Sequence, residues 1–133
     1  MADKKSVSFD TADVAAVLDG LEDEDLDGLE FGVVRMDHSG SVVAYNTSES
    51  RLSGLTKEAV MGQNFFIQVA PCTNNFLVSQ RYHDIEELDE TLDYVFTYRM
   101  VPTPVRLRLL KQRQSPYQYL LVEKQTQNKK NSR

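Results

Sequence analysis

The strongest constraint on the fold is a stretch of alternating side chains in the C-terminal third of the chain. Between residues 92 and 101, large apolar side chains occupy every second position. A period of two is that of a β-strand, whose successive side chains point to opposite faces of a sheet. We therefore expect a strand here, ending at the prolines Pro102 and Pro104. The apolar positions are Leu92, Tyr94, Phe96, Tyr98 and Met100.

Four other segments are also typical of strands. Residues 31–36 and 41–45 are rich in β-forming residues and flank a polar turn, which predicts a hairpin. Residues 105–111 and 117–124 predict two more strands after the alternating one. The order is a hairpin, several short helices and a three-stranded meander. It favours an α+β architecture, a five-stranded antiparallel sheet with short helices on one face and an N-terminal helical cap.

Helix-capping residues divide the remaining segments. Thr11, Thr56 and Asn64 can each accept a hydrogen bond from the first turn of a helix, and Gly20 can end one. The expected segments are a helix from Thr11 to Gly20, an acidic turn or helix ending at Gly28, helices at 46–52 and 56–62, a turn at 64–69 and a longer helix from about Asn75 to Leu88.

The charge is unevenly distributed. The first thirty residues carry a net charge of −8 and the remainder +3. We expect residues 1–28 to form an acidic helical cap that docks on the mildly basic body, or alternatively a solvated acidic face. Residues 29–124 would form the core, and 125–133 a disordered polar tail. The acidic balance argues against nucleic acid as a partner, because phosphate contacts need a basic surface.

The single cysteine and the hydropathy limit the compartment. One cysteine excludes an internal disulfide and fits a reducing cytoplasm. No apolar run approaches the roughly 18 residues that span a bilayer, and the first residues are polar rather than typical of a signal peptide. We therefore expect a monomeric cytoplasmic protein that does not insert into membranes.

That cysteine, Cys72, follows a short helical region with three polar side chains of interest. If 46–52 is helical, Tyr45 and Glu49 lie one turn apart on one face, with Ser53 a further turn along. A phenol, a carboxylic acid and a thiol could then converge on one pocket suited to an acidic phenol attached through sulfur. Each has an ordinary alternative: a small buried hydrophobe for Cys72, a surface carboxylate for Glu49, a half-buried strand end for Tyr45.

Other motifs are weaker. The acidic run at 23–28 is similar to the start of a calcium-binding loop, but its twelfth position is Val34, which has no carboxylate. Neither His38 nor His83 has a second ligand at metal-binding spacing, so no metal site is expected. A pairing of Cys72 with a histidine in space leaves a cysteine-dependent hydrolase or transferase as a minor alternative.

Taken together, these residues resemble the photoactive yellow protein family, blue-light receptors of the PAS fold. The resemblance covers about residues 10–124. Its most specific block is Asn-Phe-Phe-x-x-Val-Ala-Pro-Cys-Thr at 64–73. The other matching segments are 26–29, 31–32, 45–46 with Glu49, 62–63 and the alternating strand with Pro102-Thr103.

The resemblance implies a p-coumaric acid (4-hydroxycinnamic acid) chromophore bound to Cys72 as a thioester. Its phenolate would accept hydrogen bonds from Tyr45 and a protonated Glu49, with Ser53 supporting Tyr45. Light would isomerise the chromophore from trans to cis, Glu49 would then give up its proton, and the N-terminal cap would be released. The other pocket residues that the resemblance implies are Val34, Phe65, Val69, Ala70, Phe96, Tyr98 and Met100.

This chain departs from the family pattern at three places. Leu55 stands where the family has an arginine, Ser53 replaces a threonine, and the segment between Cys72 and Phe96 is a few residues shorter. The resemblance implies a photoreceptor, not an enzyme, acting on a downstream signalling protein that the sequence does not identify. The main alternative is a PAS-type protein-interaction module without chromophore.

Overall fold

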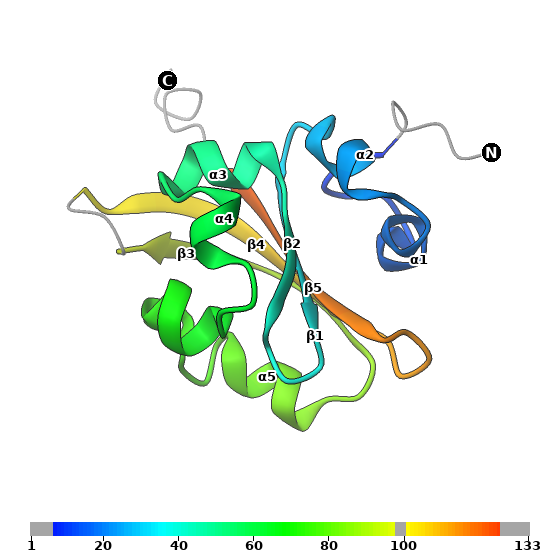
Figure 1. Ribbon diagram of the computed structural model, residues 1–133. Coiled ribbons are helices and arrows are strands. Elements are labelled where there is room, and N and C mark those ends of the chain that lie inside the picture. The colour runs from blue at the N-terminus through cyan, green and yellow to red at the C-terminus, as the bar shows by residue number, and fades with distance from the viewer. Residues whose placement is uncertain (1–6, 98–100, 126–133) are drawn as a thin grey trace, which may run out of the picture.

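The computed structural model describes residues 7–97 and 101–125. Five antiparallel strands form one sheet in the order β2-β1-β5-β4-β3 (Figure 1). The predicted α+β class with a five-stranded antiparallel sheet is therefore confirmed. The strands are β1 (Gly32–Asp37), β2 (Val42–Tyr45), β3 (Leu88–Phe96), β4 (Thr103–Lys111) and β5 (Tyr117–Lys124).

Short helices connect the strands, and side-chain caps fix where three of them begin. The side chain of Asn46 accepts from Glu49 N, that of Thr56 from Ala59 N, and that of Asn64 from the start of the next turn, as expected of N-cap residues. In the described parts of the chain, no helix is long and apolar enough to cross a membrane. The helical segments are α1 (Val14–Asp19), α2 (Asp23–Asp27), α3 (Thr47–Ser53), α4 (Lys57–Val60), the π-helical turn η2 (Phe65–Val69), the 3-10 turn η3 (Pro71–Thr73) and α5 (Ser79–Asp84).

The predicted long helix from Asn75 to Leu88 is wrong. Helix α5 begins only at Ser79, because the Asn75 side chain accepts from Leu77 N and Val78 N and holds this segment in a turn. At the other end, Leu88 already pairs with Lys111 in the β3–β4 ladder. Strand β3 therefore starts earlier than predicted, and its predicted positions Tyr98 and Met100 lie outside the described residues.

The first helix also begins later than predicted. Thr11 does not cap it, because the Thr11 hydroxyl instead accepts from Ser8 N in a preceding turn, at 2.7 Å. Helix α1 starts at Val14 and ends at Asp19, with Gly20 as its C-cap, as expected for its C-terminus. Helix α2 ends at Asp27 with Gly28 as its C-cap, where an acidic turn or helix is predicted to end.

Both faces of the sheet are buried, and the period-two alternation of β1, β4 and β5 separates them. One face, here called the helix face, packs against α3, α4, η2 and α5; its strand residues include Val34, Met36, Leu107, Leu109, Leu120 and Val122. The opposite face, here called the cap face, presents Val33, Tyr119 and Leu121 to the N-terminal segment, which contributes Phe9, Val14, Leu18 and Leu26. Figure 1 shows α1 and α2 on this second side.

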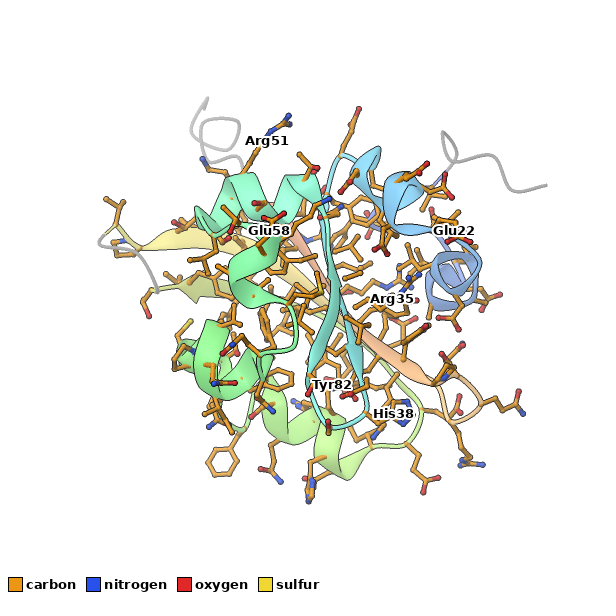
Figure 2. The ribbon with its side chains drawn as sticks, in the orientation of Figure 1. Glu22, Arg35, His38, Arg51, Glu58 and Tyr82 are labelled. Atoms are coloured by element: carbon orange, nitrogen blue, oxygen red, sulfur yellow. The ribbon has the colours of Figure 1, made fainter. Side chains whose placement is uncertain are left out.

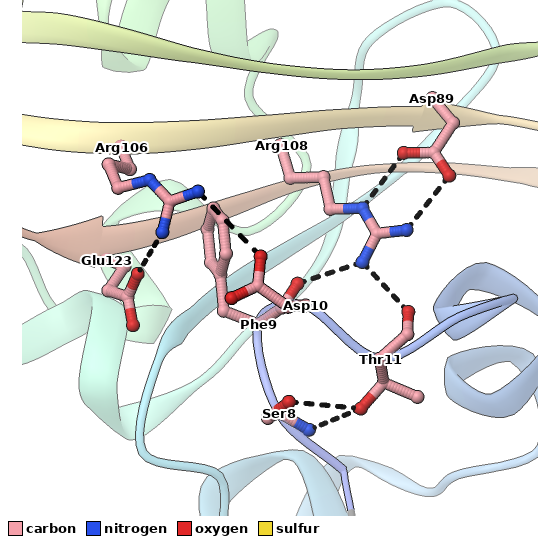
Figure 3. Close-up of polar contacts among 8 residues, drawn as sticks. All are labelled: Ser8, Phe9, Asp10, Thr11, Asp89, Arg106, Arg108 and Glu123. Carbon is pink, nitrogen blue, oxygen red and sulfur yellow. Dashed lines mark hydrogen bonds and ion pairs between the residues drawn. The ribbon is translucent and has the colours of Figure 1, made fainter.

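Arginines on the cap face hold the N-terminal segment mainly by its backbone. Arg108 in β4 donates to both carboxylate oxygens of Asp89 and to the carbonyls of Phe9 and Thr11, each at 2.9 Å (Figure 3). Next to it, Arg106 lies 3.7 Å from Asp10 and its guanidinium is over the Phe9 ring. These two arginines thus contact one acidic side chain of the N-terminal segment, Asp10, and bind two of its backbone carbonyls, those of Phe9 and Thr11.

A third arginine binds the end of α1. Arg35 in β1 is buried, and Figure 2 shows its side chain directed toward α1. It donates to the carbonyls of Leu18 and Leu21 and to the Tyr119 hydroxyl, which in turn donates to Asp19 at 2.6 Å. Cations are favourable near a helix C-terminus, where carbonyls have no partner within the helix.

Candidate functional site

Helix α3 and the end of β2 place three polar side chains in the core of the helix face. Tyr45 is the last residue of β2, and Glu49 and Ser53 lie one turn apart on α3. All three are buried, with exposed fractions of 2%, 0% and 3%. The Tyr45 hydroxyl donates to Ser53 Oγ at 2.8 Å. The structure thus brings together the three polar residues that the sequence analysis singles out.

Burial determines the protonation of the phenol in this group. Desolvation, and then the nearby Glu49 carboxyl, raise the pKa of Tyr45 above its ordinary value, and the hydrogen bond with Ser53 offsets this only in part. Tyr45 therefore keeps its proton across the physiological pH range and remains a hydrogen-bond donor.

Gly32 allows Glu49 to lie against the sheet. A Cβ atom placed on Gly32 would collide with Glu49 Oε1 and would lie 3.2 Å from its Cα and Cβ. A residue without a side chain is therefore required at this point of β1, because α3 and its carboxyl approach the strand so closely.

Asn46 joins the site to the N-terminal segment. Its Oδ1 accepts from Val33 N at 2.8 Å and from Glu49 N at 3.0 Å, while its Nδ2 donates to Leu26 O at 2.8 Å and Phe31 O at 3.0 Å. One buried side chain thus connects β1, α2 and the first turn of α3. Sequence analysis placed Asn46 at a helix start but missed this linking role, since three of its partners are distant in sequence.

A second link runs along the outside of the same junction. Asp27, at the end of α2, accepts from Thr47 N at 2.9 Å and from Lys57 Nζ at 2.6 Å. Burial alone would raise the pKa of Asp27, but the hydrogen bonds from Lys57 and Thr47 outweigh it and lower that pKa below its ordinary value. The carboxylate is therefore the form that holds α2 to α3 and α4.

The turns η2 and η3 present Cys72. Phe65 and Ala70 are fully buried, and Ala70 N donates to Phe65 O at 2.8 Å, which closes η2. Pro71 opens η3, and the Thr73 hydroxyl donates back to Ala70 O at 2.6 Å. Cys72 is a free thiol, partly buried, that packs against the core cluster of the helix face.

That cluster contains the apolar residues predicted to line the pocket. Leu55, which stands where an arginine is expected, packs against it, whereas Arg51 is exposed and Figure 2 shows it directed away from α3 into solvent. Among the predicted lining residues, Tyr98 and Met100 lie outside the described part of the chain. The buried members of the helix-face cluster include Val34, Tyr45, Phe65, Val69, Ala70 and Phe96.

The two histidines lie in elements other than those that carry Tyr45, Glu49 and Cys72. His38 and His83 are both exposed, the first in the turn after β1 and the second on α5. Within the described ranges, no three His, Cys, Asp or Glu side chains are grouped so that they could hold a metal ion.

Comparison with known proteins decides the family. A family model described as the PAS fold matches residues 23–125. The photoactive yellow protein of Halochromatium salexigens is 36% identical over 108 residues, which cover 79% of this chain and 86% of that protein. That of Rhodothalassium salexigens is 32% identical over 106 residues, covering 77% and 85%. This chain belongs to the photoactive yellow protein family.

A solved structure of the same family has the same fold. The photoactive yellow protein domain from the sensor histidine kinase Ppr of Rhodospirillum centenum superimposes with a TM-score of 0.76 at 38% identity, covering 82% of this chain and 98% of that domain. Membership of the photoactive yellow protein family makes this chain a sensory PAS domain of photoreceptor type, as the resemblance in sequence predicts.

Proposed function

We propose that this chain is a cytoplasmic blue-light photoreceptor that carries p-coumaric acid as a thioester on Cys72. One observation supports this most directly. Tyr45 is a buried phenol in the helix-face core against which Cys72 packs, and the buried Glu49 carboxyl lies on α3 one turn from Ser53, the hydrogen-bond partner of Tyr45. Buried polar groups are costly in an apolar core unless they serve a structure or a ligand.

The residues present fit that group. Cys72 is a free thiol in a partly buried turn, as attachment through sulfur requires. Tyr45 stays protonated, and it can donate its one O–H to a phenolate once the Ser53 hydroxyl, which accepts from it here, turns to donate to the Tyr45 oxygen instead. Val34, Phe65 and Phe96 are fully buried and supply apolar walls; Val69, Ala70, Tyr98 and Met100 complete the proposed lining.

Attachment needs an activated acid. The Cys72 sulfur forms a bond to the acyl carbon of an activated p-coumaroyl derivative, and the activating group departs with the electron pair of the bond that breaks. The thiol proton leaves to solvent or to the departing group. No oxidant or reductant is required.

Glu49 is the proposed proton donor. When bound, the chromophore supplies a trans-to-cis photoisomerisation and a phenolate that can be protonated. Burial disfavours the charged form of Glu49, so the carboxyl holds its proton in the dark and can donate a hydrogen bond. After it loses that proton, a carboxylate remains in an apolar core, which is unfavourable by several kcal/mol unless the surroundings rearrange, roughly the effective penalty for a buried ion.

The rearrangement would reach the N-terminal cap through α3. Glu49 N is bound by Asn46, which also binds Leu26 O in α2, and Asp27 binds Thr47 N at the start of α3. Movement of α3 in response to charge on Glu49 would therefore strain both connections. This connectivity supports the proposed release of residues 1–28 as the signalling state, which would expose the cap face to a downstream protein.

Reconstitution tests the proposal. The apoprotein is incubated with the imidazolide of p-coumaric acid, and its intact mass and absorption are recorded before and after blue light. We expect a mass increase of one p-coumaroyl group and a blue-absorbing band that bleaches and recovers, both absent in Cys72→Ser. A wild-type protein that gains no coloured adduct would overturn the proposal and favour an interaction module without chromophore.

A further inference from the structure

The peptide that carries Cys72 is held by two side chains outside its own turn. The Tyr94 hydroxyl donates to the Cys72 carbonyl at 2.6 Å. Asn75 Nδ2 donates to the same carbonyl at 3.1 Å and to the Tyr94 oxygen at 2.6 Å. The three groups form a closed triangle of hydrogen bonds around one backbone oxygen.

The directions of these hydrogen bonds are fixed by the partners. Asn75 Oδ1 accepts from Leu77 N at 2.9 Å and from Val78 N at 3.1 Å, which leaves the Nδ2 end facing Cys72. A carbonyl oxygen only accepts, so Tyr94 donates to Cys72 and accepts from Asn75. Hydrogen bonds aligned in one direction polarise and strengthen one another.

Tyr94 ties this turn to the most regular part of the molecule. It lies in β3, which pairs with β4 along its whole length, and its ring meets Phe96 edge-on at 6.1 Å. By contrast, residues 74–77 are exposed, with Phe76 82% accessible. The carbonyl of Cys72 is thus anchored to the sheet although the segment that follows it has little packing of its own.

We infer that Tyr94 and Asn75 are positioning residues that clamp the Cys72 peptide, an inference that rests on the proposed function of Cys72. When atoms attached to the Cys72 sulfur rotate, a clamped peptide cannot rotate with them, and the strain stays at the linkage. The clamp therefore raises the free energy of the light-induced state and speeds its return to the dark state. Without it, the strain spreads into the backbone and the light-induced state lasts longer.

The clamp is first tested in the apoprotein, without any chromophore. Because Cys72 is the only cysteine, cysteine labelled with ¹³C at its carbonyl marks a single backbone oxygen in the chain. Hydrogen bonds lower the stretching frequency of a carbonyl, so Tyr94→Phe and Asn75→Asp should each raise the frequency of the labelled band in the infrared spectrum. Asn75→Asp keeps the acceptor for Leu77 N and Val78 N and replaces the donor with a charged carboxylate oxygen, which cannot donate to the Cys72 carbonyl.

Matched controls remove the same chemical groups elsewhere. The Tyr82 hydroxyl donates to Tyr119 O at 2.7 Å in the core, and Asn74 Oδ1 accepts from Ser79 Oγ at 2.9 Å. Tyr82→Phe should lower the melting temperature, and neither it nor Asn74→Ala should move the labelled band. A band unmoved by both Tyr94→Phe and Asn75→Asp would overturn the clamp.

Recovery kinetics in the reconstituted protein give the second readout. Tyr94→Phe should slow dark recovery by about fivefold, the effect of one typical hydrogen bond on a rate. The double variant should slow it by less than the product of the single effects, because the three groups act as one network. Recovery that is unchanged or faster in Tyr94→Phe would contradict the inference. If the wild type forms no adduct, the proposed function fails, and the infrared band still decides whether the clamp exists.

Discussion

The two faces of the sheet are built from different interactions. On the helix face, the polar groups Tyr45, Glu49 and Ser53 lie in one patch of an otherwise apolar core. On the cap face, Arg35 and Arg108 reach from the strands to backbone carbonyls of the N-terminal segment. The first arrangement makes the core sensitive to one added charge. The second consists of hydrogen bonds to carbonyls, which water could replace if the cap separates from the sheet as we propose.

The buried apolar side chains of the cap set a minimum free-energy cost for its separation from the sheet. Phe9, Val14 and Leu18 are buried against the cap face. Each such side chain contributes about 1.5–3 kcal/mol when it is fully removed from water. The hydrogen bonds to carbonyls each add only about 0.5–1.5 kcal/mol net. Release of the cap would therefore require a strained connection from the helix face as well as loss of the arginine contacts.

The largest effect is expected where the two faces are connected. Asn46→Ala leaves Val33 N, Leu26 O and Phe31 O without their partner and removes the cap of α3. We expect the free energy of unfolding to fall by about 2–4 kcal/mol, because unsatisfied buried groups retain their desolvation cost. Urea denaturation measures it, and Thr56→Ala, which removes only an exposed cap, should cost about 1 kcal/mol. Equal losses in the two variants would show that Asn46 is only a helix cap.

A smaller effect, confined to the helix face, is expected at Gly32. Gly32→Ala forces a methyl group against the Glu49 carboxyl. Overpacking of this kind destabilises by about 1–3 kcal/mol, and in reconstituted protein it should also shift the absorption band. Gly28→Ala is the matched control, because the nearest atom to a Cβ there is Asp25 O at an ordinary 3.5 Å. An unshifted band in Gly32→Ala would mean that Glu49 does not contact the chromophore.

A loss of similar or smaller size, confined to the cap face, is expected at Arg108. Arg108→Gln removes the hydrogen bonds to Phe9 O and Thr11 O and the paired contact with Asp89. We expect about 1–2 kcal/mol of lost stability, with faster amide hydrogen exchange in α1 and unchanged exchange in α3. The exposed pair of Arg113 with Glu86 supplies the control, since Arg113→Gln should change little. If amide exchange rose equally in α1 and α3, the stability of the cap face would not be independent of that of the helix face.

The smallest effect is a pH dependence at the junction of α2 with α3. The pKa of Asp27 is lowered in the folded state. Its contribution to the free energy of unfolding is therefore present above the unfolded pKa of about 4 and is lost as the pH falls through the folded value. Asp27→Asn should therefore be less stable than wild type at pH 6 by no more than about 1 kcal/mol. In urea denaturation the difference should shrink toward pH 3. A constant difference would assign the effect to packing rather than charge.

Local chemistry explains the parts of the fold that could be predicted. Strand β5 has the predicted bounds, and the predicted caps at Thr56 and Asn64 act within one turn of their own helix. The failure at the C-terminal end of the helix predicted over 75–88 has the opposite cause. Apolar spacing after Asn75 favoured a helix, but a ladder between Leu88 and Lys111 decides where β3 begins, and no local signal reports a partner that distant.

The candidate site and its surroundings also contain features that local sequence predicts and features that only the folded chain reveals. Tyr45, Glu49 and Ser53 could be grouped from helical spacing, and the structure brings them together. The contacts of Arg108 with Phe9 and Thr11 join residues almost a hundred positions apart, so only the folded chain reveals them. The alternation of Arg106 and Arg108 with apolar residues in β4 was the available signal that this face binds something polar.

The central claim is that Glu49 holds and then gives up a proton beside a phenolate tethered to Cys72. Glu49→Gln in reconstituted protein tests it most directly, because the amide keeps a hydrogen-bond donor and cannot release a proton. The account predicts a dark absorption band shifted to the red and a proton transfer after illumination that is slowed or blocked. A variant whose dark spectrum and photocycle match those of the wild type would contradict it.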